Sequence, residues 1–277
     1  METDRRQLHL LGKIVEQQIA KLNLPLLCAN EFRVYSQWGE DGIIQYLLRH
    51  VSVSHKTFVE FGVENYQEAN TRWLVEGHNW SGLVFDGSQQ HTDAIKVDPI
   101  YWKHKLQAVC AFVDAENING LIRGNGMSGS TGILSVDIDG IDYWVWKAID
   151  VVAPAIVVVE YNSLFGPTKS VTVPYDPRFV RQKAHYSWSY YGASLAALVG
   201  LGKTKGYSFV GSNSAGNNAF FVRHELLKAP LRELTAAEGY VQRKFREARD
   251  PQGRLTFPTF EEEASLISNL PLVDVSI

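Results

Sequence analysis

The stretch YSFVGSNSAGNNAFFVR, residues 207–223, contains two apolar segments separated by a turn rich in Gly, Asn and Ser. The first segment is 207–211 and the second is 218–223. Two strands joined by so short a turn must be antiparallel neighbours in a sheet. The stretch therefore predicts a β-hairpin.

Five short apolar segments precede this hairpin, and each ends in an acidic residue or a glycine. They show little polar alternation, which is typical of parallel strands covered on both faces. Helical segments between them indicate βαβ units with right-handed crossovers. The five segments are 57–62, 82–87, 107–114, 132–137 and 155–160. The sequence thus predicts an α/β fold: a Rossmann-like, doubly wound, seven-stranded sheet, mostly parallel with a C-terminal antiparallel hairpin, as in class I methyltransferases.

Helical spacing predicts further elements on both sides of this core. Before it we expect an amphipathic helix over 5–22 and a second helix over Glu40–His50; after it we expect helices over 235–249 and Phe260–Ile267. The first helix is expected to bury Leu8, Leu11, Val15, Ile19 and Leu22. The predicted organisation is an N-terminal helical segment (1–55), a methyltransferase-type domain (56–225) and a helical C-terminal extension (226–277). The extension either covers the sheet edge or forms a dimer contact.

Composition narrows the classes of partner. The 277 residues carry a formal net charge of -3 with no Lys/Arg block, which argues against nucleic acid or an anionic membrane as partner. No apolar stretch is long enough to span a bilayer and the N-terminus lacks the apolar core of a signal peptide, so a cytoplasmic protein is expected. Cys28 and Cys110 are expected to be reduced thiols in the core.

The end of the first predicted strand favours a cationic ligand. Ligands of open parallel sheets bind outside the carboxyl ends of the strands. Gly62 would let the backbone turn tightly there, between Glu60 and Glu64. These two carboxylates would repel a pyrophosphate and attract the sulfonium and ammonium groups of S-adenosylmethionine.

The second and third predicted strands end in residues suited to a nucleoside. Asp86, followed by Gly87, stands about one βαβ unit after the glycine turn, where an acid accepts hydrogen bonds from ribose hydroxyls. Asp114 and the amide of Ala115 suit an adenine contact. An Asp before Ala-Glu-Asn is, however, an equally good helix N-cap.

The fourth and fifth predicted strands end in a dense group of acids. Asp137, Asp139 and Asp142 fall within six residues, and their carboxylates would repel one another unless a cation, an amine or a proton separates them. Glu160 and Asn162 follow the fifth strand. Asp137, Asp139, Glu160 and Asn162 are therefore candidate ligands of Mg²⁺ or another divalent cation. Alternatively, the carboxylates hold cofactor and substrate directly.

Together these motifs resemble the FkbM-type branch of class I S-adenosylmethionine-dependent methyltransferases, over residues 34–225. The shared features are Tyr35-Ser36-Gln37 with Glu40-Asp41, Phe58-Val59-Glu60-Phe61-Gly62, Asn70-Thr71, and Asp137-Ile138-Asp139-Gly140-Ile141-Asp142. The resemblance implies an enzyme that methylates a hydroxyl of a sugar or natural product. It implies that Ser36, Gln37, Glu60, Gly62, Asn70 and Asp86 lie at the cofactor and that Asp137 and Asp139 face the transferred methyl. Glu64 departs from the family pattern, because a glycine is expected there.

The long connection 163–191 is the predicted substrate-recognition segment, since loops of this length in compact domains are commonly functional. Its aromatic residues either stack on a planar acceptor or pack the loop down. Methyl transfer to oxygen needs a base for the hydroxyl proton. Asp139 or His185 is predicted to take that proton, with Glu160 and Asn162 orienting the acceptor or a metal.

Two other functions agree with the same residues. The chain would be a nucleotide-dependent Rossmann-type transferase, for example of sugars, if Asp137 and Asp139 held a metal-bound diphosphate, but the acidic first loop argues against that. The second alternative is a protein that has the same fold but no catalytic activity and acts as an interaction module. The sequence leaves open the small-molecule acceptor, the choice of O- or N-methylation, and whether the chain forms a homo-oligomer.

Overall fold

The computed structural model describes residues 2–276, and seven of its strands form one mixed sheet. The strand order is β3-β2-β1-β4-β5-β8-β7, in which β8 is antiparallel to both of its neighbours and the other pairs are parallel. The strands are β1 (Thr57–Phe61), β2 (Ser81–Asp86), β3 (Leu106–Cys110), β4 (Gly129–Val136), β5 (Val152–Glu160), β7 (Tyr207–Ser212) and β8 (Asn218–Arg223). The predicted fold class, including the hairpin of β7 and β8, is confirmed.

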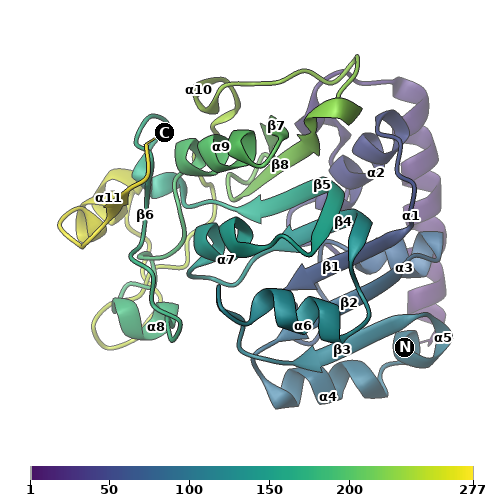
Figure 1. Ribbon diagram of the computed structural model, residues 1–277, viewed down its shortest axis with the longest axis horizontal. Helices are drawn as coiled ribbons and strands as arrows, with labels where there is room; N and C mark the ends of the chain where they lie inside the picture. Colours follow the sequence, from purple (N-terminus) through teal and green to yellow (C-terminus); the bar gives the residue numbers. More distant parts are fainter. Residues whose placement is uncertain (1, 277) are drawn as a thin grey trace.

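Helices cover both faces of this sheet (Figure 1). One face carries α6 (Ile118–Gly124), α7 (Asp142–Ala148) and α9 (Leu195–Thr204); the other carries α2 (Glu40–His50), α3 (Arg72–His78), α4 (Gln89–Val97) and α5 (Pro99–Lys103), with α1 (Glu2–Leu22) outside them. Successive strand residues point to opposite faces: Val59 packs with the first group of helices and Phe58 with the second. Both are fully buried, which explains why the strands lack polar alternation.

The C-terminal extension folds back towards the tips of the parallel strands. In Figure 1 the arrowheads of these strands point to the side that carries α8 (Arg181–Ala184), α11 (Phe260–Ile267) and β6 (Val171–Thr172). β6 pairs with β9 (Val273–Asp274), so the long connection and the chain's last described strand form a second small sheet. The shorter elements are η1 (Leu27–Asn30), η2 (Ser163–Phe165), η3 (His224–Leu226) and α10 (Ala236–Gly239).

Three expectations about helices and core are wrong. The predicted helix 235–249 is helical only in α10, because the following amides pair with other parts of the chain: Val241 donates to the Tyr161 hydroxyl and Lys244 to the carbonyl of Ala215. β3 ends at Cys110, four residues early, and Cys110 is exposed, as is Cys28. Neither thiol is therefore a core residue.

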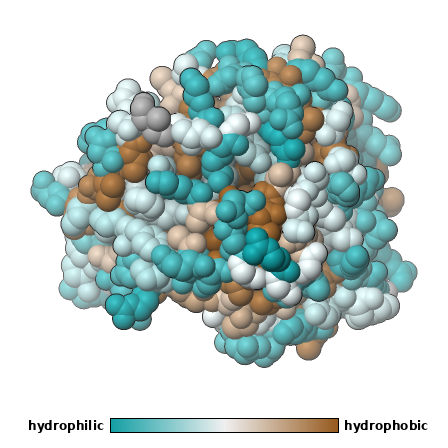
Figure 2. Space-filling model, in the orientation of Figure 1, coloured by the Kyte–Doolittle hydropathy of each residue, from teal (hydrophilic) through white to brown (hydrophobic). Residues whose placement is uncertain are grey.

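The first helix forms as predicted, but only part of its predicted apolar face meets the body. Val15 and Ile19 pack against the cluster that contains Trp73, whereas Leu8, Leu11 and Leu22 are exposed. The helix lies close to the body at Gly12, where an added Cβ would lie 2.9 Å from Val34 and 3.0 Å from the ring of Trp73. No helix among residues 2–276 is long and apolar enough to cross a membrane. Figure 2 shows a largely hydrophilic face on which apolar residues form separate patches.

Candidate functional site

Two adjoining clefts open at the carboxyl ends of the parallel strands. We call the first, of about 260 Å³, the apolar cleft; its walls include Phe85, Asp86, Gly87, His91, Phe112, Val113, Ile141 and Phe179. We call the second, of about 410 Å³, the acidic cleft; its walls include Gln37, Trp38, Glu60, Glu68, Asn70, Glu160, Asn218, Phe245 and Glu247. Both clefts are lined by Gly62, Glu64, Asp137, Asp139 and Arg181. Their shared wall joins them into one site.

Gly62 forms the point where the two clefts meet. Its φ of +70° lies in the left-handed region, and a Cβ added there would lie 1.7 Å from the carbonyl oxygen of Asp137. Its amide donates to the carbonyl of Phe85 at 3.0 Å. Only glycine allows β1 to pass this close to the end of β4, and this contact brings three strand tips together.

Asp86 is held in place by the loop that follows Gly62. The amide of Glu64 donates to its Oδ2 at 2.8 Å, the amide of Ser88 donates to its Oδ1 at 2.8 Å, and Nδ1 of His91 lies 3.0 Å from Oδ1. Glu64 has a φ of +47°, in the left-handed region that glycine adopts most readily. The loop therefore takes a conformation suited to glycine although the residue here is a glutamate.

Glu60 fixes the entry to α3. It accepts hydrogen bonds from the amides of Asn70 at 2.9 Å and Thr71 at 3.2 Å, and from the Thr71 hydroxyl. Burial raises the pKa of Glu60 to about 7. Asn70, which lines the acidic cleft, also donates from its side chain to the Ser135 hydroxyl at 3.1 Å.

Asp41 folds the segment that precedes α2. Its Oδ2 accepts the amides of Val34, Tyr35 and Ser36 at 2.7 to 2.9 Å. The Ser36 hydroxyl in turn accepts the Asp41 amide at 3.0 Å, and burial raises the pKa of Asp41 to about 6. Ser36 is fully buried and lines neither cleft, whereas its neighbour Gln37 lines the acidic cleft. Of this predicted pair, only Gln37 is in position to meet a ligand.

The acidic cleft contains a cluster of three carboxylates. Each of them places one carboxylate oxygen within 4.8 Å of an oxygen of the other two; the three residues are Asp137, Asp139 and Glu160. In the described chain, no donor hydrogen-bonds to the Asp137 carboxylate, and the buried Oε2 of Glu160 has no partner. Burial, followed by repulsion from the neighbouring carboxylates, raises the pKa of both residues well above its usual value. We call these three residues the acidic cluster.

Arg181, from the first position of α8, is the counter-charge that the sequence reasoning missed. Its Nη1 donates to Asp139 at 2.5 Å, its Nη2 pairs with Glu247, and its guanidinium stacks 4.0 Å from the centre of the Tyr191 ring. The side chain is 7% exposed. The sequence does indicate that a cation is needed, because several carboxylates follow the strand ends. Nothing in the long connection, however, distinguishes Arg181 from its other arginine.

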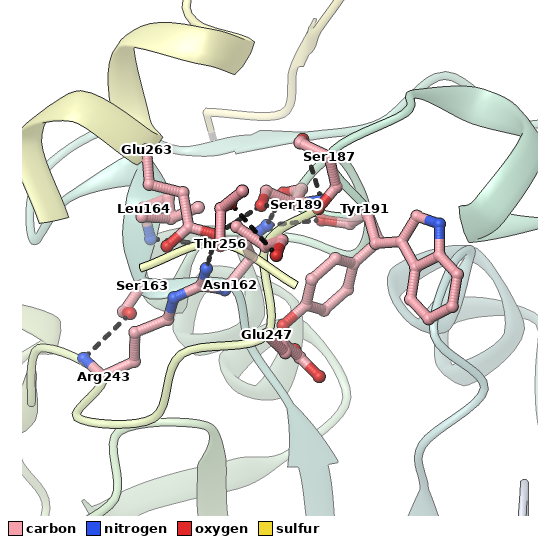
Figure 3. A network of polar contacts seen from close by, with 12 residues as sticks. Asn162, Ser163, Leu164, Ser187, Ser189, Tyr191, Arg243, Glu247, Thr256 and Glu263 are labelled. Carbon is pink, nitrogen blue, oxygen red and sulfur yellow. Dashed lines mark hydrogen bonds and ion pairs between the residues drawn. The ribbon is translucent and has the colours of Figure 1, made fainter. Parts of the chain in front are cut away.

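The segment after α10, residues 240–249, roofs the acidic cleft; we call it the strap. Trp38 stacks on Phe245 with ring centres 5.6 Å apart. Figure 3 shows how the strap is anchored: Arg243 pairs with Glu263 of α11, and its amide donates to the Ser163 hydroxyl at 3.1 Å. The C-terminal extension therefore supplies one wall of the site.

The structure does not bring His185 and Asn162 to either cleft. Nδ1 of His185 lies 2.7 Å from the Ser187 hydroxyl, within the long connection. The side-chain amide of Asn162 donates to the carbonyls of Ser189 and Tyr191, and its oxygen accepts the Leu164 amide at the start of η2, so the side chain holds the long connection. The prediction of His185 as base and Asn162 as metal ligand is not supported.

Three further predicted residues have structural partners. Asp114 accepts the amides of Glu116 and Asn117, and the amide of Ala115 donates to the Tyr175 hydroxyl, so neither faces the apolar cleft. Asp114 therefore orders the turn that precedes α6, whose N-cap residue is Asn117, and is not itself the helix cap. Asp142 accepts the amides of Ile138 and Gly140 and lies outside the acidic cluster.

Comparisons with known proteins give a partial likeness in fold. No family model and no curated protein sequence matches the chain. The O-methyltransferase from Bacillus cereus in complex with SAH is 16% identical over 76% of this chain and 88% of its own, with a TM-score of 0.41. The N-terminal domain of EvdMO1, solved with SAH and D-fucose, is 11% identical over 76% and 94%, with a TM-score of 0.41. The function must therefore be argued from the geometry of the two clefts.

Proposed function

We propose that this chain is an S-adenosylmethionine-dependent methyltransferase acting on a hydroxyl of a small acceptor, in line with its resemblance to the FkbM-type branch. The observation that carries the proposal is Asp86: a carboxylate at the tip of β2, fixed by two backbone amides and facing an apolar cleft beside the Gly62 turn. A strand-tip acid in that place is suited to a ribose diol.

The two clefts divide the cofactor between them. The ribose would lie at Asp86, with the adenine between Phe112 and Ile141 in the apolar cleft. The sulfonium would lie past Gly62, where Asp137 supplies negative charge, and the methionine end would enter the acidic cleft beside Asn70. Opposite charges attract most strongly where water is excluded, so a ligand with positively charged sulfur fits this arrangement better than a diphosphate does.

Asp139 is the proposed base. The acceptor hydroxyl attacks the methyl carbon in line with the carbon–sulfur bond; that bond breaks with its electron pair staying on sulfur, and the hydroxyl proton passes to Asp139. The half-exposed carboxylate of Asp139 lines both clefts and is oriented by Arg181. Glu160 lies on the acceptor side, under the roof formed by the strap. Proximity and alignment supply most of the acceleration in such a displacement.

Isothermal titration calorimetry tests the cofactor assignment. We expect S-adenosylhomocysteine to bind with 1:1 stoichiometry, and NAD and UDP-glucose not to bind. Asp86→Asn should weaken binding about tenfold or more, because hydrogen bonds to a charged group contribute about 1.5–3 kcal/mol. Asp114→Asn is the matched control, since this carboxylate caps a turn and faces neither cleft. Equal affinities in Asp86→Asn and wild type, with correct folding of both, would contradict the assignment.

A further inference from the structure

The acidic cluster lacks the partners that buried carboxylates normally have. Buried polar atoms are nearly always hydrogen-bonded, yet Oε2 of Glu160, a residue that is 7% exposed, has no partner. Its other oxygen, Oε1, has the Tyr191 hydroxyl as donor at the long distance of 3.5 Å. The Asp137 carboxylate accepts no hydrogen bond from any residue in the described chain. Two carboxylates therefore reach the same wall of the acidic cleft with free lone pairs.

The charges around the cluster leave room for one divalent cation. Asp137, Asp139, Glu160 and Glu247 contribute four negative charges when ionised, and Arg181, which pairs with both Asp139 and Glu247, contributes one positive charge. The negative charge that remains exceeds what Arg181 offsets, and a divalent cation would neutralise most of it. In metal sites, a carboxylate that ligates the ion is usually oriented by a hydrogen bond from a residue that does not touch the ion. Arg181 donates such a hydrogen bond to Oδ1 of Asp139.

We propose that Asp137, Asp139 and Glu160 form a binding site for a divalent cation of the Mg²⁺ or Mn²⁺ type. Three carboxylates without nitrogen or sulfur ligands are the donor set that such hard cations select. The site stands on the geometry of the cluster alone. Its part in catalysis rests on the proposed function: Asp139 would ligate the ion through one oxygen and take the acceptor proton on the other, and acceptor oxygens would fill the ion's remaining positions, which favours acceptors with a hydroxyl next to a second oxygen.

Electron paramagnetic resonance with Mn²⁺ measures the site directly, without turnover. Metal-free protein is titrated with Mn²⁺, and we expect one ion per chain, displaced by excess Mg²⁺. Glu160→Gln and Asp137→Asn should each weaken binding at least about tenfold. Glu68→Gln is the matched control: it removes an acid from the same cleft, but Glu68 is half-exposed and paired with Arg33, outside the cluster.

The outcomes separate this inference from the proposed function. Absence of bound Mn²⁺ in the wild type, or unchanged affinity in both cluster variants, overturns the metal site. Calorimetry with S-adenosylhomocysteine on the wild type and on Glu160→Gln reports the cofactor assignment independently, because Glu160 lines only the acidic cleft, whereas Asp137 lines both clefts. Circular dichroism and the melting temperature establish that each variant is folded, so a lost site is distinguished from a lost fold.

Discussion

The two clefts differ in how completely their polar groups are satisfied. In the apolar cleft, the Asp86 carboxylate already has two amide donors and His91 at hydrogen-bond distance, so it holds its position before any ligand arrives. In the acidic cleft, the buried Oε2 of Glu160 has no partner, and no described residue donates a hydrogen bond to the partly exposed Asp137 carboxylate. The first cleft is therefore pre-organised, whereas the second has unpaired carboxylate oxygens that the proposed cation would satisfy.

This difference is informative about function. A neutral ribose needs acceptors in fixed positions, and pre-organisation lowers the entropy lost on binding it. Unpaired buried carboxylates, by contrast, cost stability unless they are protonated or neutralised. Natural sequences retain such a cost mainly where a ligand removes it, which is how a strained or unsatisfied group indicates a functional site.

The largest effect is expected from changing the residue that joins the two clefts. Gly62→Ala places a Cβ 1.7 Å from the carbonyl oxygen of Asp137 and forces a side chain into the left-handed region. Overpacking costs about 1–3 kcal/mol and the left-handed conformation about 1–2 kcal/mol, so we expect a loss of about 4 kcal/mol in the free energy of unfolding. Urea denaturation measures the loss, and calorimetry should find no binding of S-adenosylhomocysteine.

Gly87→Ala is the control for this change. Gly87 lines the apolar cleft, has no positive φ, and its added Cβ would approach only the Phe112 ring, at 3.4 Å. We expect a change within about 1 kcal/mol. Similar losses in both variants would mean that the contact between the β1 and β4 tips is not what joins the clefts.

An intermediate effect is expected from the acidic cleft, and it depends on pH. The pKa of Glu160 is raised in the folded state, first by burial and then by Asp137. The protonated Glu160 carboxyl contributes its full stabilisation below the pKa that this residue has in the unfolded chain. That contribution is lost as the pH rises through the pKa of Glu160 in the folded state. Without metal, wild-type stability should therefore fall as the pH rises above about 4.3, the pKa of an unperturbed Glu, towards the raised folded-state pKa. Glu60, with a pKa raised to about 7, adds to this fall.

Glu160→Gln isolates the contribution of that residue. Gln imitates the protonated carboxyl, so in the presence of EDTA the variant should be more stable than wild type by about 1 kcal/mol near pH 8, and by much less near pH 5. Chemical denaturation at the two pH values measures this, with Glu68→Gln as control. A destabilised variant near pH 8 would show that the acidic cleft is satisfied without a cation, and the contrast between the clefts would disappear.

The sequence predicted the pre-organised cleft better than the incomplete one. The positions of Gly62 and Asp86 follow from strand ends, and strand ends follow from apolar segments that the sheet buries on both faces. The contacts of Arg181, Phe245 and Glu247 depend on irregular segments without apolar periodicity. Their conformation is set by tertiary partners, so local patterns cannot predict it.

His185 and Asn162 illustrate the same limit. The titration range of histidine favours His185 as a base, and Asn162 stands two residues after Glu160 at a strand end. In the structure both serve the long connection: Asn162 bonds two of its carbonyls, and His185 bonds Ser187. A polar side chain near a site satisfies the backbone of an irregular loop more often than it faces the ligand, because such loops have few regular backbone partners of their own.

The smallest effect is expected at Glu64, and it tests whether the apolar cleft depends on backbone alone. Glu64→Gly relieves a left-handed residue but adds entropy to the unfolded chain, and these contributions nearly cancel, so the free energy of unfolding should change by about 0.5 kcal/mol or less. The amide remains to donate to Asp86, so the affinity for S-adenosylhomocysteine should change less than about threefold. Glu64→Ala removes the carboxylate while keeping a Cβ in the left-handed region, and calorimetry and denaturation of the two variants separate charge from conformation. If both lose affinity equally and strongly, the Glu64 carboxylate itself attracts the ligand, and the apolar cleft then relies on an unpaired acid just as its neighbour does.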